Sequence, residues 1–147
     1  MSVTCRVLPT IEVAFPNLVE FGGVRPYADI NESYEISQPQ TITIRSNITW
    51  MLQMKSDSPH GCMTRWVNNE YTDESLCFPL EWQIVGESIY KEVTGNNVII
   101  VENENATQPS GKSIDIRFRQ LITYNDPPLL GSDSYRIQLT FTASHAY

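Results

Sequence analysis

The sequence predicts an all-β protein, built as a single antiparallel β-sandwich of the immunoglobulin-like or pilin-like kind. Three observations favour this class. Apolar and polar residues alternate over short runs, Val, Ile, Thr and aromatic residues are concentrated in those runs, and turn residues recur about every 8–12 positions. The chain has 147 residues, 41% of them hydrophobic and 18% charged. That is enough for one ordinary domain with its own core, and it is too apolar for a disordered chain.

The expected strands follow from these runs in chain order. Segments 3–7, 11–15, 18–21, 41–44, 50–54 and 80–84 alternate or are rich in strand-forming residues. The uninterrupted apolar run 98–101 predicts a strand buried on both sides. Residues 114–119 and 135–143 alternate most regularly, and turn-rich sequence joins them. We therefore expect these last two segments to form adjacent antiparallel strands.

One long segment interrupts the pattern. Residues 56–76 are polar and aromatic and have no clean period, which predicts a long loop without regular structure, a feature that is often functional. The resulting organisation is an N-terminal strand or donor arm at 1–15, followed by a sandwich domain at 16–147 with a long Cys-flanked loop at 56–77.

Charge excludes some classes of partner. The formal net charge is −7 and the ten basic residues are scattered, whereas nucleic acid and anionic membranes require clustered Lys and Arg. No apolar run approaches the length of about 18 residues that spans a bilayer. We expect neither nucleic acid as a partner nor a membrane span.

The expected location is extracellular or at the cell surface. The N-terminus lacks the apolar core of a secretory signal, because Arg6, Pro9 and Glu12 interrupt it. The chain is then either cytosolic or a mature form without its leader, and the sequence favours export. Asn-x-Ser/Thr sequons support export modestly and provide the candidate glycosylation sites Asn31, Asn47 and Asn105.

Three ordered motifs carry a family resemblance. Residues 21–26 (FGGVRP), 46–52 (SNITWML) and 135–143 (YRIQLTFTA) resemble the layout of secreted bacterial and archaeal surface β-sandwich modules. This group includes pilin-like domains, spore-coat-U-like fimbrial domains and WxL-type wall domains. The resemblance implies the sandwich fold and an extracellular setting, and it implies no catalytic residues.

No constellation of catalytic residues is present in the sequence. The two histidines are His60 and His145, and the second lies near the C-terminus, where chains fray. There is no Gly-x-Ser-x-Gly elbow, no Gly-rich phosphate loop and no His-Glu-x-x-His motif. We therefore expect a protein that is not an enzyme and that needs no cofactor.

The three cysteines leave several interpretations open. A disulfide between Cys62 and Cys77 is the simplest, because it would staple the long loop. Two buried thiols, or a metal site completed by His60, are the alternatives, although structural zinc needs four ligands. Cys5 is then unpaired, and its apolar neighbours favour a free thiol over an intermolecular bond.

A calcium site would need six to eight oxygen ligands. Asp57, Asp73 and Glu74 could supply oxygen ligands, but the dense Asp-x-Asp spacing of calcium loops is missing. No metal site is predicted.

The aromatic residues divide into two groups. Trp50 and Trp82 are in register with apolar neighbours and should lie in the core. Trp66 and Tyr71, with the nearby amides of Asn68 and Asn69, form a candidate binding loop, because rings stack on sugar faces and amides bond hydroxyl groups. The alternative is that these rings fold back over the sandwich.

The predicted function is a non-enzymatic extracellular structural protein, a subunit of a surface filament or coat. It would self-assemble as a homopolymer by β-strand addition, or donor-strand complementation, with residues 2–15 entering a neighbouring sandwich. The same residues could instead be the first strand of their own sheet. The alternative function is a carbohydrate-binding or adhesin module that binds glycans through the 56–76 loop.

Overall fold

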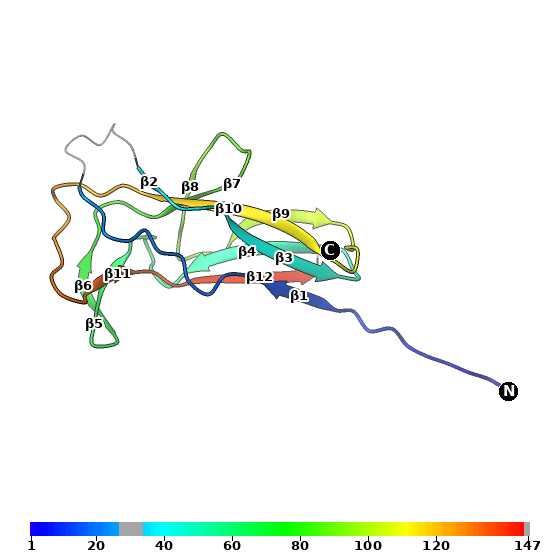
Figure 1. The fold of residues 1–147 in the computed structure, drawn as a ribbon. Helices are drawn as coiled ribbons and strands as arrows, with labels where there is room; N and C mark the ends of the chain where they lie inside the picture. The colour runs from blue at the N-terminus through cyan, green and yellow to red at the C-terminus, as the bar shows by residue number, and fades with distance from the viewer. Residues whose placement is uncertain (27–33, 146–147) are drawn as a thin grey trace.

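The computed structural model describes residues 1–26 and 34–145. Within them the protein is all-β and forms several antiparallel sheets (Figure 1). The first sheet has six strands: β1 (Ile11–Ala14), β2 (Glu35–Ile36), β3 (Gln40–Ser46), β7 (Glu81–Ile84), β8 (Lys91–Glu92) and β10 (Lys112–Gln120). The second has β4 (Trp50–Ser56), β9 (Val98–Glu104) and β12 (Leu139–His145). The third has β5 (Thr64–Val67), β6 (Glu70–Ser75) and β11 (Ser134–Arg136).

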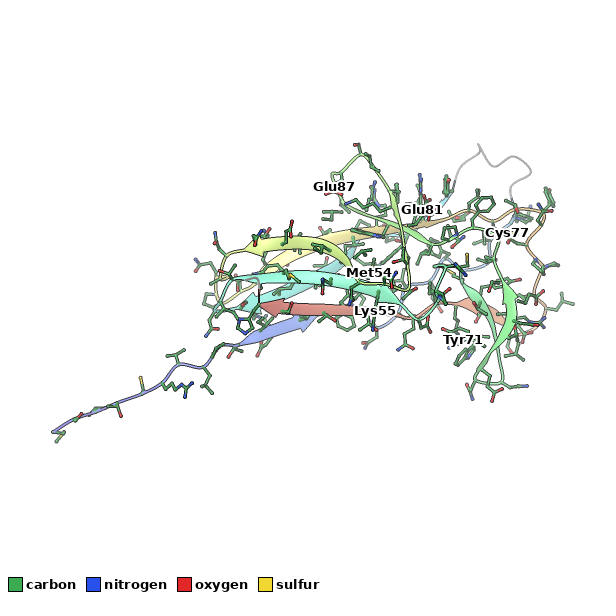
Figure 2. The ribbon with its side chains drawn as sticks, turned by 180° about the vertical axis from the view of Figure 1, so that it is seen from behind. Met54, Lys55, Tyr71, Cys77, Glu81 and Glu87 are labelled. Carbon is green, nitrogen blue, oxygen red and sulfur yellow. The ribbon has the colours of Figure 1, made fainter. Side chains whose placement is uncertain are left out.

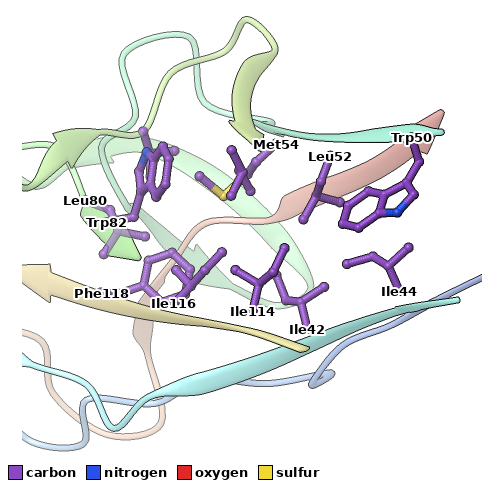
Figure 3. Close-up of a cluster of buried hydrophobic side chains, with 12 residues drawn as sticks. Ile42, Ile44, Trp50, Leu52, Met54, Leu80, Trp82, Ile114, Ile116 and Phe118 are labelled. Atoms are coloured by element: carbon purple, nitrogen blue, oxygen red, sulfur yellow. The ribbon is translucent and has the colours of Figure 1, made fainter. Parts of the chain in front are cut away.

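The first and second sheets face each other across the hydrophobic core (Figure 3). In the first sheet the order is β1-β3-β10-β7-β8, with β2 also paired to β10, and in the second the order is β12-β4-β9. Alternate side chains of each strand point inward, as the pleat of a strand requires. The core side chains from the first sheet are Ile42, Ile44, Trp82, Ile114, Ile116 and Phe118, and those from the second are Trp50, Leu52, Met54 and Ile100.

The third sheet extends the molecule at one end, and the N-terminal residues extend from the other (Figure 1). β4 leads into the β5–β6 hairpin, and β11 pairs with β5 just before the chain enters β12. The two ends therefore present different chemistry, an extended arm at one and a small hairpin sheet at the other.

The strand predictions at 41–44, 50–54, 80–84, 98–101 and 114–119 each coincide with a strand. Two short ones are wrong. Residues 3–7 form no strand, because no described strand lies beside them to supply hydrogen bonds. Residues 18–21 are also irregular, although Val19 and Phe21 pack against the core.

The predicted pairing of 114–119 with 135–143 is wrong. Both edges of β10 are already occupied, by β3 and β2 on one side and β7 on the other, so the later segment pairs with β4 in the opposite sheet. The segment is also broken into β11 and β12, since it changes partner from β5 to β4 around Ile137 and Gln138. The strand at 98–101 is an edge strand, and its Ile99 is 47% exposed rather than buried.

The prediction of a structureless loop at 56–76 is also wrong. Residues 64–75 form the β5–β6 hairpin, whose two turn residues Asn68 and Asn69 have φ angles of 51° and 64°. A two-residue hairpin turn of type I′ requires positive φ at both positions, and Asn tolerates it better than most residues. The turn chemistry was present in the sequence, but the flanking residues do not alternate cleanly.

Leu52 lies at the centre of this packing and is fully buried. We expect Leu52→Ala to lower the free energy of unfolding by about 2–5 kcal/mol, because the substitution leaves a cavity between the sheets. Urea denaturation followed by circular dichroism measures the loss. Ile89→Ala, at a side chain that is 68% exposed, serves as the control and should change stability by less than about 0.5 kcal/mol. Equal losses for the two variants would contradict this account of the core.

Candidate functional site

The N-terminal arm, residues 1–10, is the most exposed part of the described chain. Every residue in it is exposed, with Val3 at 89% and Val7 at 79%. Its side chains alternate: Val3, Cys5 and Val7 fall on one side of an extended backbone, and Ser2, Thr4 and Arg6 on the other. This pattern suits a strand that lies on a sheet, yet residues 1–7 pair with no strand in the described structure.

β12 is an edge strand without the usual protection. It pairs with β4 in one continuous register over all seven residues, and no described strand pairs with its outer edge. None of its residues is Pro, Lys, Arg, Asp or Glu. Natural edge strands are normally blunted by charges, proline or bulges, because a long regular edge is a template for another strand.

The inward side chains of β12 are also incompletely covered. Leu139, Phe141 and Ala143 pack against the core but remain partly exposed, whereas the inward residues of the neighbouring β4 are fully buried. The apolar surface along β12 is therefore continuous with the core and partly exposed to solvent at the edge of the sheet.

The opposite edge of the same sheet differs. β9 pairs with β4 through two shifts of register, and its Asn103 has a φ of 54°. Bulges of this kind twist an edge strand away from regular pairing. The end of β9 also carries Glu102 and Glu104. The second sheet thus has one protected edge, at β9, and one unprotected edge, at β12.

β1 lies beside β12 across the rim of the core. Phe15, just after β1, contacts Phe141 of β12 with their ring centroids 5.6 Å apart. This contact closes the seam between the first and second sheets.

The β5–β6 hairpin carries the predicted binding-loop residues, of which Tyr71 is labelled in Figure 2. The rings of Trp66 and Tyr71 meet edge to face with centroids 4.8 Å apart. The guanidinium of Arg136, on β11, lies 5.2 Å from the centroid of the Trp66 ring. Asn68 and Asn69 form the turn of the hairpin. The structure therefore brings the two rings together and uses the two Asn residues as turn formers.

A shallow pocket of about 360 Å³ lies beside this hairpin. Its lining residues are Asp57, Ser58, Pro59, His60, Cys62, Thr64, Tyr71, Thr72, Asp73, Ser75 and Arg136.

Asp57 connects the hairpin to the junction of β11 and β12. The Tyr71 hydroxyl donates to Asp57 Oδ2 at 2.7 Å, and the backbone N–H of Gln138 donates to Asp57 Oδ1 at 3.0 Å. Burial, followed by the hydrogen bond to the Asp57 carboxylate and its charge, raises the pKa of Tyr71 to about 12. Sequence reasoning missed this bracing role of Asp57, which it had considered only as a calcium ligand.

The predicted disulfide between Cys62 and Cys77 is not formed, and all three cysteines are free thiols. The β5–β6 ladder continues past Thr64 and Ser75 through a 2.9 Å bond from Leu76 N–H to Met63 O, which places the two cysteines at opposing positions.

Each thiol instead has its own partner. Cys62 Sγ donates to His60 O at 3.8 Å, and Cys77 is hydrogen-bonded to the Asp126 carboxylate. Burial raises the pKa of Cys62, and the hydrogen bond to Asp126 raises that of Cys77. Both groups therefore stay in the thiol form, which is a poor nucleophile for disulfide chemistry. Cys5, predicted to be free, is exposed on the arm.

The remaining predicted sites lie apart from one another. Asn31 falls outside the described residues. Asn47 and Asn105 are both exposed, and Asn105 O accepts a hydrogen bond from the indole N–H of the buried Trp50 at 3.0 Å. Within residues 1–26 and 34–145, no three His, Cys, Asp or Glu side chains are grouped closely enough to hold a metal ion. No helix long and apolar enough to cross a membrane occurs in those residues.

Comparison with known proteins adds no family assignment. No protein-family model matches the chain, and no curated protein is similar to it.

The Asp57–Tyr71 contact can be tested by titration. We expect Asp57→Asn to lower the pKa of Tyr71 from about 12, because the negative charge beside the phenol is removed, but to leave it above 10, because burial is the largest cause of the shift. Tyrosine Cζ shifts measured by NMR against pH report the change.

Asp73→Asn is the control, since Asp73 lines the same pocket but does not accept the Tyr71 hydroxyl. The stability that this environment contributes is fully present below pH 10 and is lost as the pH rises toward 12, because the folded-state pKa lies above the unfolded one. A Tyr71 pKa that responds equally to both variants would contradict the assigned contact.

Proposed function

We propose that this protein is a non-enzymatic structural subunit of an extracellular surface filament or coat, and that it self-assembles by β-strand addition. The observation that carries the proposal is the pairing of two features in one chain. Within the described residues, the extended arm with its strand-like alternation pairs with no strand over residues 1–7, and no strand pairs with the outer edge of the regular strand β12. In strand addition, main-chain hydrogen bonds supply affinity and alternate side chains fill pockets.

The dimensions of the two segments are compatible. At about 3.3 Å per residue the ten residues of the arm span about 33 Å, and the seven residues of β12 span about 23 Å. Val3, Cys5 and Val7 would then face the open rim beside Phe141 and Ala143, and the polar side chains between them would face water.

The order of strands gives further support and favours an immunoglobulin-like sandwich. β1, β3, β10 and β7 occupy the sheet positions of strands A, B, E and D of that fold. β4 and β12 occupy the positions of C and F, and β9 adds an extra strand on the far side of β4. In an immunoglobulin domain strand G pairs with the outer edge of F, which is the edge that β12 leaves unpaired among the described residues.

Assembly of this kind is directional. The arm of one copy meets a different surface, β12, on the next, so the contact is head to tail and lacks a two-fold axis. Repeated contacts of this type produce an open filament when the rotation between successive copies does not close a ring. The new strand needs about 4.8 Å of width beside β12, so the Phe15–Phe141 contact has to separate for the donor to enter.

Glycan binding at the hairpin is the second candidate, and it has weaker support. Trp66 is covered on its ring by Tyr71 and Arg136, and a ring that is engaged in this way has less free face for stacking on a sugar. The pocket offers hydroxyl and carboxylate groups, but the Tyr71 hydroxyl and the Asp57 carboxylate are hydrogen-bonded to each other.

The arm side that faces β12 can be tested in the full chain. We expect Val3→Asp combined with Val7→Asp to weaken the subunit contact on the order of a hundredfold or more, because an unpaired carboxylate costs several kcal/mol to bury. Size-exclusion chromatography with light scattering, together with negative-stain microscopy, measures assembly.

Ser2→Asp combined with Thr4→Asp adds the same charge on the opposite side of the arm and should assemble like the wild type. All four positions are exposed, so the urea midpoint of both variants should match that of the wild-type monomer. The proposal fails if the wild type stays monomeric at high concentration, or if the inward-facing pair assembles normally.

Cys5 provides an independent readout of burial. We expect iodoacetamide to label Cys5 at least about tenfold more slowly in the assembled form than in the monomer, because reagent access requires exposure. Peptide mapping by mass spectrometry reports each cysteine separately. Cys77 is also exposed and lies on the hairpin side (Figure 2), so its labelling is the internal control. Equal protection of both cysteines, or of neither, would contradict docking through the arm.

A further inference from the structure

The arm of each copy begins next to the end of its own acceptor edge. Ile11 of β1 pairs with Ser46 of β3, and His145 of β12 pairs with Trp50 of β4, only four residues further along the chain from Ser46. From this end of the molecule the arm extends away from the body (Figure 1). To reach the outer edge of its own β12, it would have to reverse direction within residues 8–10.

Asn47 holds this root of the arm in its outward direction. The Asn47 side chain donates from Nδ2 to Leu8 O at 2.9 Å and accepts the Thr10 N–H on Oδ1 at 2.8 Å. The Asn47 backbone N–H donates to Thr10 O at 3.3 Å. These bonds continue the β1–β3 ladder beyond the Ile11–Ser46 pair, so a reversal at the root would break all of them.

Two further features of the root resist a turn back. Pro9 lies between the two residues that Asn47 holds, and a proline both fixes its own φ near −65° and biases the preceding residue toward extended conformations. The second feature is that the side chain at position 47 is an amide, which donates and accepts at the same time. Asn has one donor and one acceptor group, whereas an ionised Asp has acceptors only and would repel Leu8 O.

We propose that Asn47 is a positioning residue that commits the arm to a second copy of the chain and keeps it from folding back onto its own β12. This inference rests on the proposed strand-addition function. Asn47 is also the acceptor of an Asn-x-Thr sequon, and the same Nδ2 would carry the glycan. A glycan there would replace one amide hydrogen and add a bulky group beside Leu8.

The test uses Asn47→Ala in the full chain, with Asn97→Ala as the control at another exposed Asn, just before β9. In the monomer we expect the Thr10 amide hydrogen of Asn47→Ala to exchange about tenfold faster than that of the wild type, as expected when its hydrogen bond is lost. A nitroxide on an outward-facing Thr4→Cys, in a background with Cys5→Ser, Cys62→Ser and Cys77→Ser, should broaden the β12 amide resonances of its own chain in Asn47→Ala but not in the wild type.

The inference is overturned if the own-chain broadening of Asn47→Ala matches that of the wild type and of Asn97→Ala, even when Thr10 exchanges faster. That result would mean that the released arm does not turn back. Mixing nitroxide-labelled chains with separate ¹⁵N-labelled chains tests docking between copies. If this mixture shows no broadening while Asn47→Ala broadens its own β12, strand addition between copies is wrong and the positioning role of Asn47 still holds.

Discussion

The packing of β4 against the facing sheet is the interaction on which the rest of the structure depends. Trp50, Leu52 and Met54 are fully buried. They lie in one cluster with the inward-facing side chains of β3 and β10 (Figure 3). Both neighbours of β4 in the second sheet take their register from it. Because β3 and β4 are joined by only three residues, the same strand also links the two sheets covalently.

A consequence of this arrangement is that β4 pairs with a strand on both edges, whereas β12 and β9, within the described residues, each pair with a strand on one edge. The outer edges of β9 and β12 differ. Irregular pairing and acidic residues blunt β9, and a uniform row of neutral residues leaves β12 ready to pair. Sheet proteins normally carry features on their edge strands that block edge-to-edge association. The β9 edge carries such features, and the β12 edge, as far as the structure describes it, lacks them.

Local alternation is sufficient to predict most of the long strands, since it reports which face of a strand is buried. It does not report which strand lies alongside. Ala143 pairs with Leu52 and Ile114 with Ile42, and these distant partners depend on which edges are already occupied. The β5–β6 hairpin was missed because Arg65 and Glu74, which form an ion pair across it, hide the period of a half-buried strand. The roles of Asp57 and Asn47 depend on a few hydrogen bonds between segments far apart in the chain, for which one sequence has no signal.

The tryptophans are distributed one to each sheet: Trp82 on β7 of the first, Trp50 on β4 of the second and Trp66 on β5 of the third. Trp50 and Trp82 are shielded from water, and Trp66 is partly exposed. Indole emission shifts to longer wavelength with contact to water, so each sheet contains its own fluorophore. A set of variants that each keep one Trp and have Phe at the other two positions reports the sheets separately. Comparing the variant that keeps Trp66 with those that keep Trp50 or Trp82 shows whether the hairpin sheet loosens before the core does.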